Sequence, residues 1–146
     1  MKIIPFEEKY RDDMIFMILE AKNALGRVPR LNGDLLDIKT NYLDKGDMFW
    51  IAVDENDRVV GSVVGYSSVE GSTEVWLHRL FVKYDLKHSG IGTQLLQTAE
   101  NHAKQNGKTA VHVHLGAPKE QWFESYGFYP KNGYAEYKER YMKKEL

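Results

Sequence analysis

Two glycines, Gly90 and Gly92, stand where an apolar strand gives way to a long amphipathic helix, in the stretch LFVKYDLKHSGIGTQLLQTAENHAKQNGK (80–108). Glycine has no side chain to cover the backbone, so the N–H groups at this turn are open to a ligand. The first turn of a helix also has N–H groups without an intrahelical partner and the positive end of the helix dipole. Together these features predict an anion site, and phosphate is the usual anion at such a turn.

Two common phosphate-binding motifs do not fit these glycines. A Walker A loop needs a glycine, four further residues and then Gly-Lys-Ser/Thr, and the chain has no such string. A dinucleotide-binding fingerprint needs a third glycine or alanine where this chain has Leu95. The predicted phosphate site therefore belongs to neither of these two motifs.

The segments before the central strands predict two helices. The apolar run 2–6 is stopped by Pro5, which is typical of an edge strand. Helical spacing indicates the first helix through Met14, Ile18, Ala21 and Leu25. Asp34 is placed to cap a second helix, which Gly46 would end.

The rest of the chain predicts a sheet interrupted by two helices. MFWIAVDE (48–55) and RVVGSVVGYSS (58–68) flank a tight turn, and TEVWLHRLFV (73–82) follows as a third strand. A helix from Ile91 to Gly107 precedes the strand TAVHVHL (109–115), which places valines on one face and His112 and His114 on the other. KEQWFESYGF (119–128) reads as a helix ending at Gly127. The segment 133–146 reads as strand, although its charges also suit a helix.

Two ordered signatures in this pattern resemble the GNAT acetyltransferase superfamily. The strand end Leu80-Phe81-Val82 leads into the loop 87–92, like the family's acetyl-CoA motif, and the aromatic helix Trp122–Phe128 resembles a second family signature. The resemblance implies an α/β fold over residues 1–146 as one domain, with a mixed, mostly antiparallel central sheet flanked by helices and splayed middle strands. It also implies acetyl-CoA as acyl donor.

The resemblance assigns the cofactor-binding residues. Backbone N–H groups of the loop and first helical turn would hold the pyrophosphate, beside the Lys87 side chain; these residues are His88, Ser89, Gly90, Ile91, Gly92 and Thr93. The backbone of Leu80, Phe81 and Val82 would pair with the pantetheine arm like an added strand. The aromatic helix, including Phe123, would lie along the other side of that arm.

The chain departs from the family pattern at four positions. Lys87 stands where arginine or glutamine is usual, which keeps the charge but loses the planar fork, and His88 replaces a frequent glycine. Phe123 occupies the place of a tyrosine that often protonates the leaving thiolate. Gly116 stands where an asparagine is common. The cofactor half of the pattern is therefore intact, whereas the catalytic half is altered.

Candidate catalytic residues lie on the strand before the loop and on the aromatic helix. Period-two alternation places Glu74, Trp76, His78, Leu80 and Val82 on one face. His78 has an ordinary pKa suited to accepting a proton, and some arylalkylamine acetyltransferases of this family carry a catalytic histidine four residues before the same valine. Glu74 is the second choice as base. Tyr126 is either a proton donor in place of the missing tyrosine or a packing aromatic.

The acceptor amine is expected over the loop 23–34, where Arg27 and Arg30 either hold a carboxylate or phosphate of the substrate or remain solvated. The three histidines His78, His112 and His114 have no cysteine or carboxylate pattern to complete a metal site, so no metal is expected.

Composition narrows the partners and the compartment. The net charge of −1, with no massed lysines, argues against nucleic acid and anionic membranes as partners. The absence of cysteine and of an apolar leader favours a cytoplasmic location. The sequence therefore predicts an N-acyltransferase that moves an acetyl group to a primary amine of a small molecule or peptide within a ternary complex. An acyl-CoA sensor without turnover is the alternative, and a homodimer is among the assemblies that the family resemblance implies.

Overall fold

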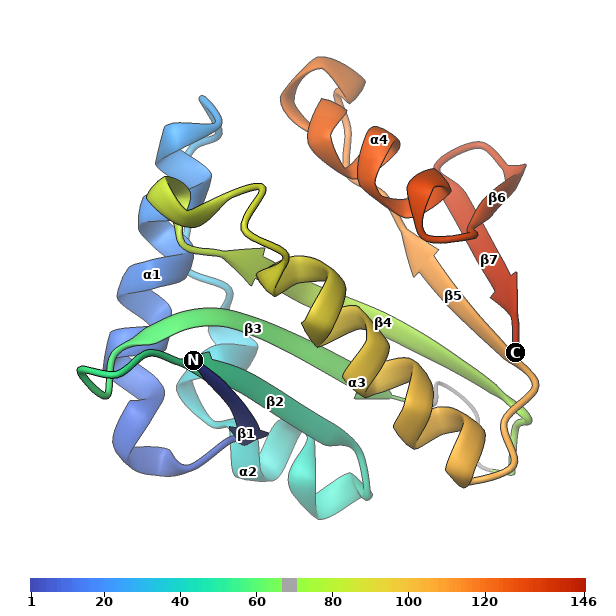
Figure 1. The fold of residues 1–146 in the computed structure, drawn as a ribbon, viewed down its shortest axis with the longest axis horizontal. Helices are drawn as coiled ribbons and strands as arrows, with labels where there is room; N and C mark the ends of the chain where they lie inside the picture. The colour runs from blue at the N-terminus through green and yellow to red at the C-terminus, as the bar shows by residue number, and fades with distance from the viewer. Residues whose placement is uncertain (67–70) are drawn as a thin grey trace.

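One seven-stranded sheet runs through the chain in a computed structural model that describes residues 1–66 and 71–146 (Figure 1). Its strands are β1 (Lys2–Pro5), β2 (Met48–Val53), β3 (Val59–Tyr66), β4 (Glu74–Val82), β5 (Ala110–His114), β6 (Ala135–Lys138) and β7 (Tyr141–Glu145). Their order in the sheet is β1-β2-β3-β4-β5-β7-β6. Among the strands that the structure describes, β4–β5 is the one parallel pair, so the sheet is mixed and mostly antiparallel, as the resemblance implies. Ser67 and Ser68, the end of one predicted strand, lie outside the described residues.

In the described residues, four α-helices accompany the sheet: α1 (Arg11–Ala24), α2 (Ile38–Asn41), α3 (Ile91–Gln105) and α4 (Phe123–Lys131). Short 3-10 helices are η1 (Glu8–Tyr10), η2 (Gly33–Leu36), η3 (Leu43–Lys45), η4 (Tyr84–Leu86) and η5 (Lys119–Gln121). In Figure 1, α3 crosses the near face of the sheet, while α1 and α2 lie behind it. The prediction that residues 133–146 form strand is confirmed, because β6 and β7 pair as an antiparallel hairpin.

Two hydrophobic clusters hold these layers together, one on each face of the sheet. The α3 face buries the helical stripe predicted from the sequence, namely Ile91, Leu95, Ala99 and Ala103, against strand valines and leucines. The opposite face buries Met14, Ile18 and Leu35 against Phe49 and Ile51. Because burial of a large aliphatic side chain stabilises by about 1.5–3 kcal/mol, these two clusters fix α1 and α3 firmly to the sheet.

The second helix is shorter than expected and has a different cap. Asp34 does not cap it, because its carboxylate is bound by Arg79 from β4 and lies within η2. Asp37 takes the capping role, and its side chain accepts a hydrogen bond of 3.1 Å from the Thr40 N–H. The prediction for Asp34 was therefore wrong, since a long-range ion pair outweighs a local cap.

The aromatic helix also continues past its predicted end at Gly127. α4 runs to Lys131, and the left-handed residue that ends it is Gly133, with φ of +93°. Phe128 is partly buried and packs on the core, and Tyr129 is almost fully buried in it. The packing of these two rings extends the helix through a glycine that would otherwise weaken it.

A β-bulge in β4 determines which side chains share a face. Ser62 pairs with Phe81 and Val64 with His78, so Val63 opposes both Arg79 and Leu80. Arg79 has φ of +56°, a left-handed value that non-glycine residues adopt rarely. Its carbonyl accepts a hydrogen bond from the buried Ser62 hydroxyl at 2.7 Å, which satisfies the displaced group.

The bulge overturns the simple alternation expected for β4. Val75 and Leu77 belong to the α3-side cluster, and Leu80 and Val82 pack against the same cluster. The contacts of His78 are instead with Tyr42, in the cluster on the opposite face. The prediction that Glu74, Trp76, His78, Leu80 and Val82 share one face was therefore wrong, because the extra residue reverses the alternation.

The middle of the sheet is splayed, as predicted. The β4–β5 register ends at Leu77 and Val113, while β4 continues along β3 to Val82. Figure 1 shows β4 and β5 separating toward the end where α4 faces the loop before α3. The β5-facing edge of residues 78–82 is therefore left without a strand partner in the part of the chain that the structure describes.

Candidate active site

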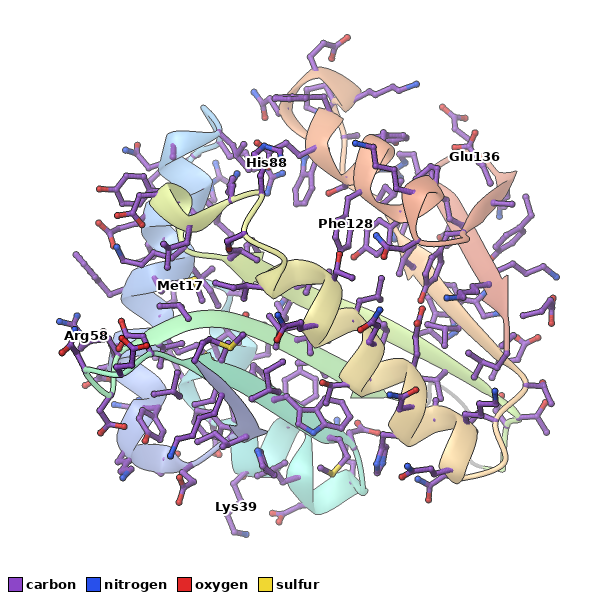
Figure 2. The ribbon with its side chains drawn as sticks, in the orientation of Figure 1. Met17, Lys39, Arg58, His88, Phe128 and Glu136 are labelled. Carbon is purple, nitrogen blue, oxygen red and sulfur yellow. The ribbon has the colours of Figure 1, made fainter. Side chains whose placement is uncertain are left out.

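A cavity of about 720 Å³ lies where the splayed strands, the start of α3 and α4 meet. Figure 2 shows His88 on the loop before α3 and Phe128 on α4, on two sides of this space. The cavity is lined by nearly all of the residues assigned to the cofactor: Leu80, Phe81, Val82, Lys87, His88, Gly90, Ile91, Gly92, Thr93 and Phe123. The fold thus gathers them around a single opening.

The glycine turn has the geometry that an anion requires. Gly90 precedes α3 with φ of +88°, and no side chain caps the first turn of that helix. A Cβ on Gly92 would lie 3.3 Å from Phe128 Cε1 and 3.5 Å from Val82 Cγ2, so glycine leaves the floor of the cavity open. Ser89 does not line the cavity, and its hydroxyl donates to the Leu86 carbonyl. Open first-turn N–H groups at a cavity of this size fit a pyrophosphate.

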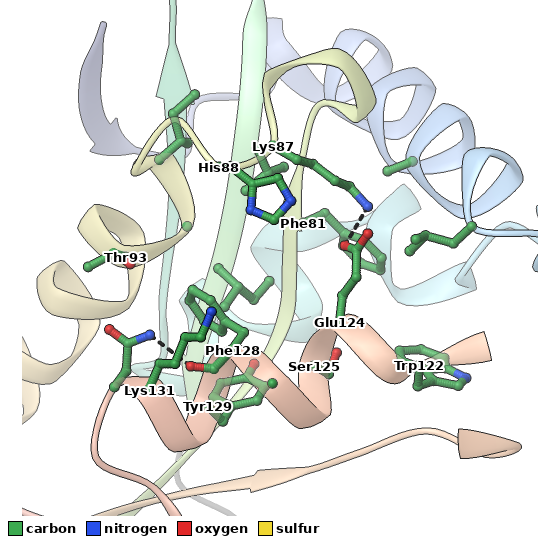
Figure 3. A pocket seen from close by; sticks show the side chains of 18 of the residues that line it. Phe81, Lys87, His88, Thr93, Trp122, Glu124, Ser125, Phe128, Tyr129 and Lys131 are labelled. Atoms are coloured by element: carbon green, nitrogen blue, oxygen red, sulfur yellow. Dashed lines mark hydrogen bonds and ion pairs between the residues drawn. The ribbon is translucent and has the colours of Figure 1, made fainter. Parts of the chain in front are cut away.

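Lys87 crosses the cavity to α4. Its Nζ lies 2.6 Å from Glu124 Oε2, and Figure 3 shows this ion pair between the loop and the helix. Both side chains are largely buried, at 19% and 34% exposed. A phosphate bound at the turn would therefore share the Lys87 ammonium with Glu124 or replace it as partner.

Two aromatic residues of α4, Phe123 and Tyr126, were candidates for contact with the cofactor or the leaving group. Phe123 is 60% exposed and lines the cavity, and its phenyl ring has no proton to donate to a thiolate. Tyr126 is not among the lining residues; its ring packs against the core and lies 4.9 Å from Lys119 Nζ. This placement favours the packing interpretation of Tyr126.

His78 belongs to a polar network on the other face of β4 and is not among the residues that line the cavity. Its Nε2 lies 2.9 Å from the Tyr42 hydroxyl, which donates to Asp34. Arg79 also binds Asp34, with Nη2 2.9 Å from Oδ1 and Nε 3.1 Å from Oδ2. A carboxylate only accepts hydrogen bonds, so the single Tyr42 proton is committed to Asp34. The oxygen of Tyr42 then faces His78 Nε2 with its lone pairs.

Burial and charge keep the His78 ring neutral. Burial lowers the pKa of His78 to about 4, and the Arg79 charge adds to this effect while Asp34 opposes it. The pKa of Asp34 is also lowered: burial works against ionisation, but hydrogen bonds from Arg79 and Tyr42 outweigh it. Near neutral pH the network therefore pairs an ionised carboxylate with an uncharged imidazole.

This depressed pKa predicts a pH-dependent stability. The unfolded chain binds a proton at His78 near pH 6.5 and the folded chain does so only near pH 4, so stability falls as pH drops between these values. Between pH 7 and pH 5, wild type should lose about 2 kcal/mol more unfolding free energy than His78→Gln. Urea unfolding at the two pH values measures this difference, and equal losses in the two proteins would contradict it.

Glu74 does not reach the cavity. It is half exposed, and its Oε2 lies 2.8 Å from Nε2 of the buried His112, whose ring stacks on Trp76. His112 also shares a hydrogen bond of 2.9 Å with the Tyr137 hydroxyl. Within residues 1–66 and 71–146, no three histidine or acidic side chains converge as metal ligands.

The two arginines of the 23–34 loop differ sharply. Arg30 is exposed, whereas Arg27 is 9% exposed, lines the cavity and stacks on Trp122. Sequence reasoning missed the partners of these candidates, namely Tyr42, Glu124 and Trp122. Tyr42 is a buried core residue, and only the long-range contact with His78 reveals its polar role.

The splayed α/β sheet and the glycine turn define a class of protein with a coenzyme-sized site between two parting strands. Residues 45–136 match the acetyltransferase (GNAT) domain, and the chain belongs to this family. The chain is 37% identical over 82 residues to a probable N-acetyltransferase, camello, of Xenopus tropicalis. That match covers 56% of this chain and only 37% of the frog protein.

Solved structures of low sequence identity share the whole fold. An acetyltransferase of the GNAT family from Staphylococcus aureus Mu50 superposes with a TM-score of 0.87 at 22% identity, over 99% of this chain and 98% of that one. The PaiA N-acetyltransferase of Thermoplasma acidophilum, solved in complex with coenzyme A, superposes with a TM-score of 0.74 at 18% identity over the full length of both chains.

None of the helices in residues 1–66 and 71–146 combines the length and the apolar character that crossing a bilayer requires.

Proposed function

We propose that this chain transfers an acetyl group from acetyl-CoA to a primary amine of a small molecule or peptide, by direct attack within a ternary complex. The observation that carries the proposal is the cavity between the start of α3, whose first turn has no side-chain cap, and the edge of β4 that no described strand pairs with beyond Leu77. First-turn N–H groups would hold the pyrophosphate, and the β4 backbone at residues 80–82 would pair with the pantetheine amides. Membership of the GNAT family supports the same assignment.

The chemistry required is nucleophilic attack by an amine on a thioester. The amine nitrogen forms a bond to the acyl carbon, the carbon–sulfur bond breaks, and the amine loses a proton. Holding the two substrates in register lowers the barrier by about 7–11 kcal/mol, whereas a positioned acid or base typically contributes about 10²–10⁴-fold in rate. Binding and orientation by the cavity are therefore the main contribution, and Phe123 need not donate a proton because water can protonate the thiolate.

His78 is the proposed acceptor of the amine proton. It lies one residue beyond the last β4–β5 pair, where the strands part, and its ring is neutral near pH 7. The Asp34–Tyr42 pair holds the ring in place through Nε2. Glu74 remains the weaker candidate, since its carboxylate lies against His112.

A sensor that binds acyl-CoA without turnover is the second candidate, favoured by Phe123 and Gly116 in two positions where the family usually has polar groups. Calorimetric titration of acetyl-CoA, followed by release of free CoA thiol across a panel of primary amines, separates the two. An enzyme gives amine-dependent thiol release that falls at least about 10²-fold in His78→Gln. A sensor binds acetyl-CoA and releases no thiol with any amine, and absence of binding contradicts both functions.

The single-domain organisation of residues 1–146, the cytoplasmic location and the homodimer remain predictions of the sequence. Gel filtration with light scattering tests the last of these.

A further inference from the structure

Two buried cations lie at the end of α1 and in the loop that follows it. Lys22 is 8% exposed and Arg27 is 9% exposed. The Lys22 ammonium donates to the Arg30 carbonyl at 2.9 Å and to the Asn32 side-chain oxygen, so its partners are neutral. Both pKa values are lowered, in each case mainly by burial. A positive charge that is buried without a counter-ion is costly unless a ligand supplies one.

Arg27 is held in place by groups that leave most of its donors unused. Its Nε donates to the Gln121 carbonyl at 2.8 Å, and its Cζ lies 3.5 Å from the centre of the Trp122 ring. In the described part of the chain, no carboxylate lies within ion-pair distance of Arg27, and no acceptor is bound to its two terminal nitrogens. Four of the five guanidinium N–H groups therefore remain available to a ligand, on a side chain that lines the cavity.

The acids near Arg27 and Lys22 are already committed to other partners. Glu124, the one carboxylate that raises the pKa of Arg27, is paired with Lys87 at 2.6 Å. Asp34 is held by Arg79 and Tyr42. This part of the cavity therefore carries an excess of positive charge, and a planar guanidinium with a free edge matches a carboxylate in two parallel hydrogen bonds.

The phosphates of the cofactor do not account for this charge. In Figure 3, Trp122 lies at one end of the pocket and Thr93, in the first turn of α3, lies at the other. Arg27 stacks on Trp122 and so lies at the end away from the glycine turn. The anion that it would bind is therefore separate from the pyrophosphate.

We propose that Arg27 binds a carboxylate carried by one of the two substrates, either on the acyl group of the donor or on the acceptor amine. This inference rests on the proposed acyl transfer and specifies its substrate class. Stacking on Trp122 and the bond to Gln121 fix the plane of the guanidinium, so the cavity selects a carboxylate over the neutral group of the same shape.

Matched ligand pairs test the proposal and identify the source of the carboxylate. In the donor arm, calorimetry compares succinyl-CoA with acetyl-CoA. In the acceptor arm, the protein saturated with CoA is titrated with a panel of α-amino acids and with their α-carboxamides. We expect wild type to prefer the carboxylate by roughly 10- to 100-fold in one arm, the range for hydrogen bonds to a charged group.

Three variants separate recognition from folding. Arg27→Gln should abolish the preference, and Arg27→Lys, which keeps the charge but loses the fork, should retain part of it. Arg30→Gln removes an exposed arginine of the same loop and should leave the preference unchanged. The ratio of the two affinities is read within each protein, so a general loss of stability does not imitate the result.

The outcomes are distinct. Equal affinity of wild type for carboxylate and neutral ligand in both arms overturns the inference, and so does a preference that survives in Arg27→Gln. Absence of acetyl-CoA binding by wild type contradicts the proposed function itself, whereas acetyl-CoA binding without a carboxylate preference contradicts this inference alone.

Discussion

Gly90→Glu should weaken acetyl-CoA binding by at least about 100-fold. The substitution places a carboxylate at the start of α3, where the first-turn N–H groups would hold the pyrophosphate. Like charges about 5 Å apart repel by about 3 kcal/mol at an effective dielectric of about 20, and the lost hydrogen bonds to a charged group add about 1.5–3 kcal/mol. Calorimetric titration of wild type and variant measures the loss.

The helix itself provides the matched control. Gly107 lies beyond the far end of α3 with φ of +76°, close to the +88° of Gly90, and a Cβ there would meet nothing within 4 Å. Gly107→Glu therefore imposes the same backbone strain and the same charge away from the cavity, and it should bind acetyl-CoA as wild type does. Gly90→Ala isolates the strain without the charge. Similar affinities of Gly90→Glu and Gly107→Glu would show that the turn does not bind the phosphates.

The sequence predicts the elements that local chemistry determines. The glycines before α3, the apolar stripe of that helix and the tight turn after β2 all depend on neighbours a few residues away. For this reason the order of the elements along the chain follows from pattern, whereas the assignment of residues 80–82 and 87–93 to the cofactor rests on the resemblance to the family.

The parts that the sequence does not predict depend on long-range contacts. The residue with positive φ in the β4 bulge is Arg79 and not a glycine, so the residue types in the sequence do not predict the bulge. The bulge is stabilised by two groups from other elements: the Ser62 hydroxyl donates to the Arg79 carbonyl, and Asp34 pairs with the Arg79 guanidinium. The resulting reversal of faces separates His78 from Leu80 and connects it to Tyr42, a pairing 36 residues apart in sequence.

The burial of Arg27 in the cavity is a second feature that depends on long-range contacts and that the sequence does not predict. An arginine in a Gly- and Pro-containing loop is usually solvated, and Arg30 in the same loop is exposed. What buries Arg27 is the indole of Trp122 and the carbonyl of Gln121, a contact across 94 residues. The difference between the two arginines is therefore a property of the tertiary structure.

Gly116→Ala should destabilise the fold by about 2–4 kcal/mol, because the alanine side chain would occupy the space in which the Trp122 ring packs. A Cβ at Gly116 would lie 2.0 Å from Trp122 Cε2 and 2.4 Å from Cδ2, closer than any packing allows, so the indole must move. Overpacking costs typically about 1–3 kcal/mol, and a displaced ring also loses its cation–π contact with Arg27, about 0.5–2 kcal/mol. Denaturant unfolding of variant and wild type measures the difference.

Gly127→Ala is the control for this substitution, since a Cβ there would meet nothing within 4 Å and the residue lies inside α4. Alanine in a helix interior should stabilise by about 0.5–1 kcal/mol relative to glycine. If Gly116→Ala is as stable as wild type, the close packing of the Trp122 ring against Gly116 is contradicted.

A double-mutant cycle with Trp122→Ala identifies the cause of the loss. Once the indole is absent, the alanine at position 116 meets no ring, so Gly116→Ala should cost little in that background. An unchanged cost there would assign the effect to the backbone instead of to the clash. The expected coupling also gives a reason for glycine where the family commonly has asparagine: a side chain at 116 and an indole that stacks on Arg27 cannot occupy the same space.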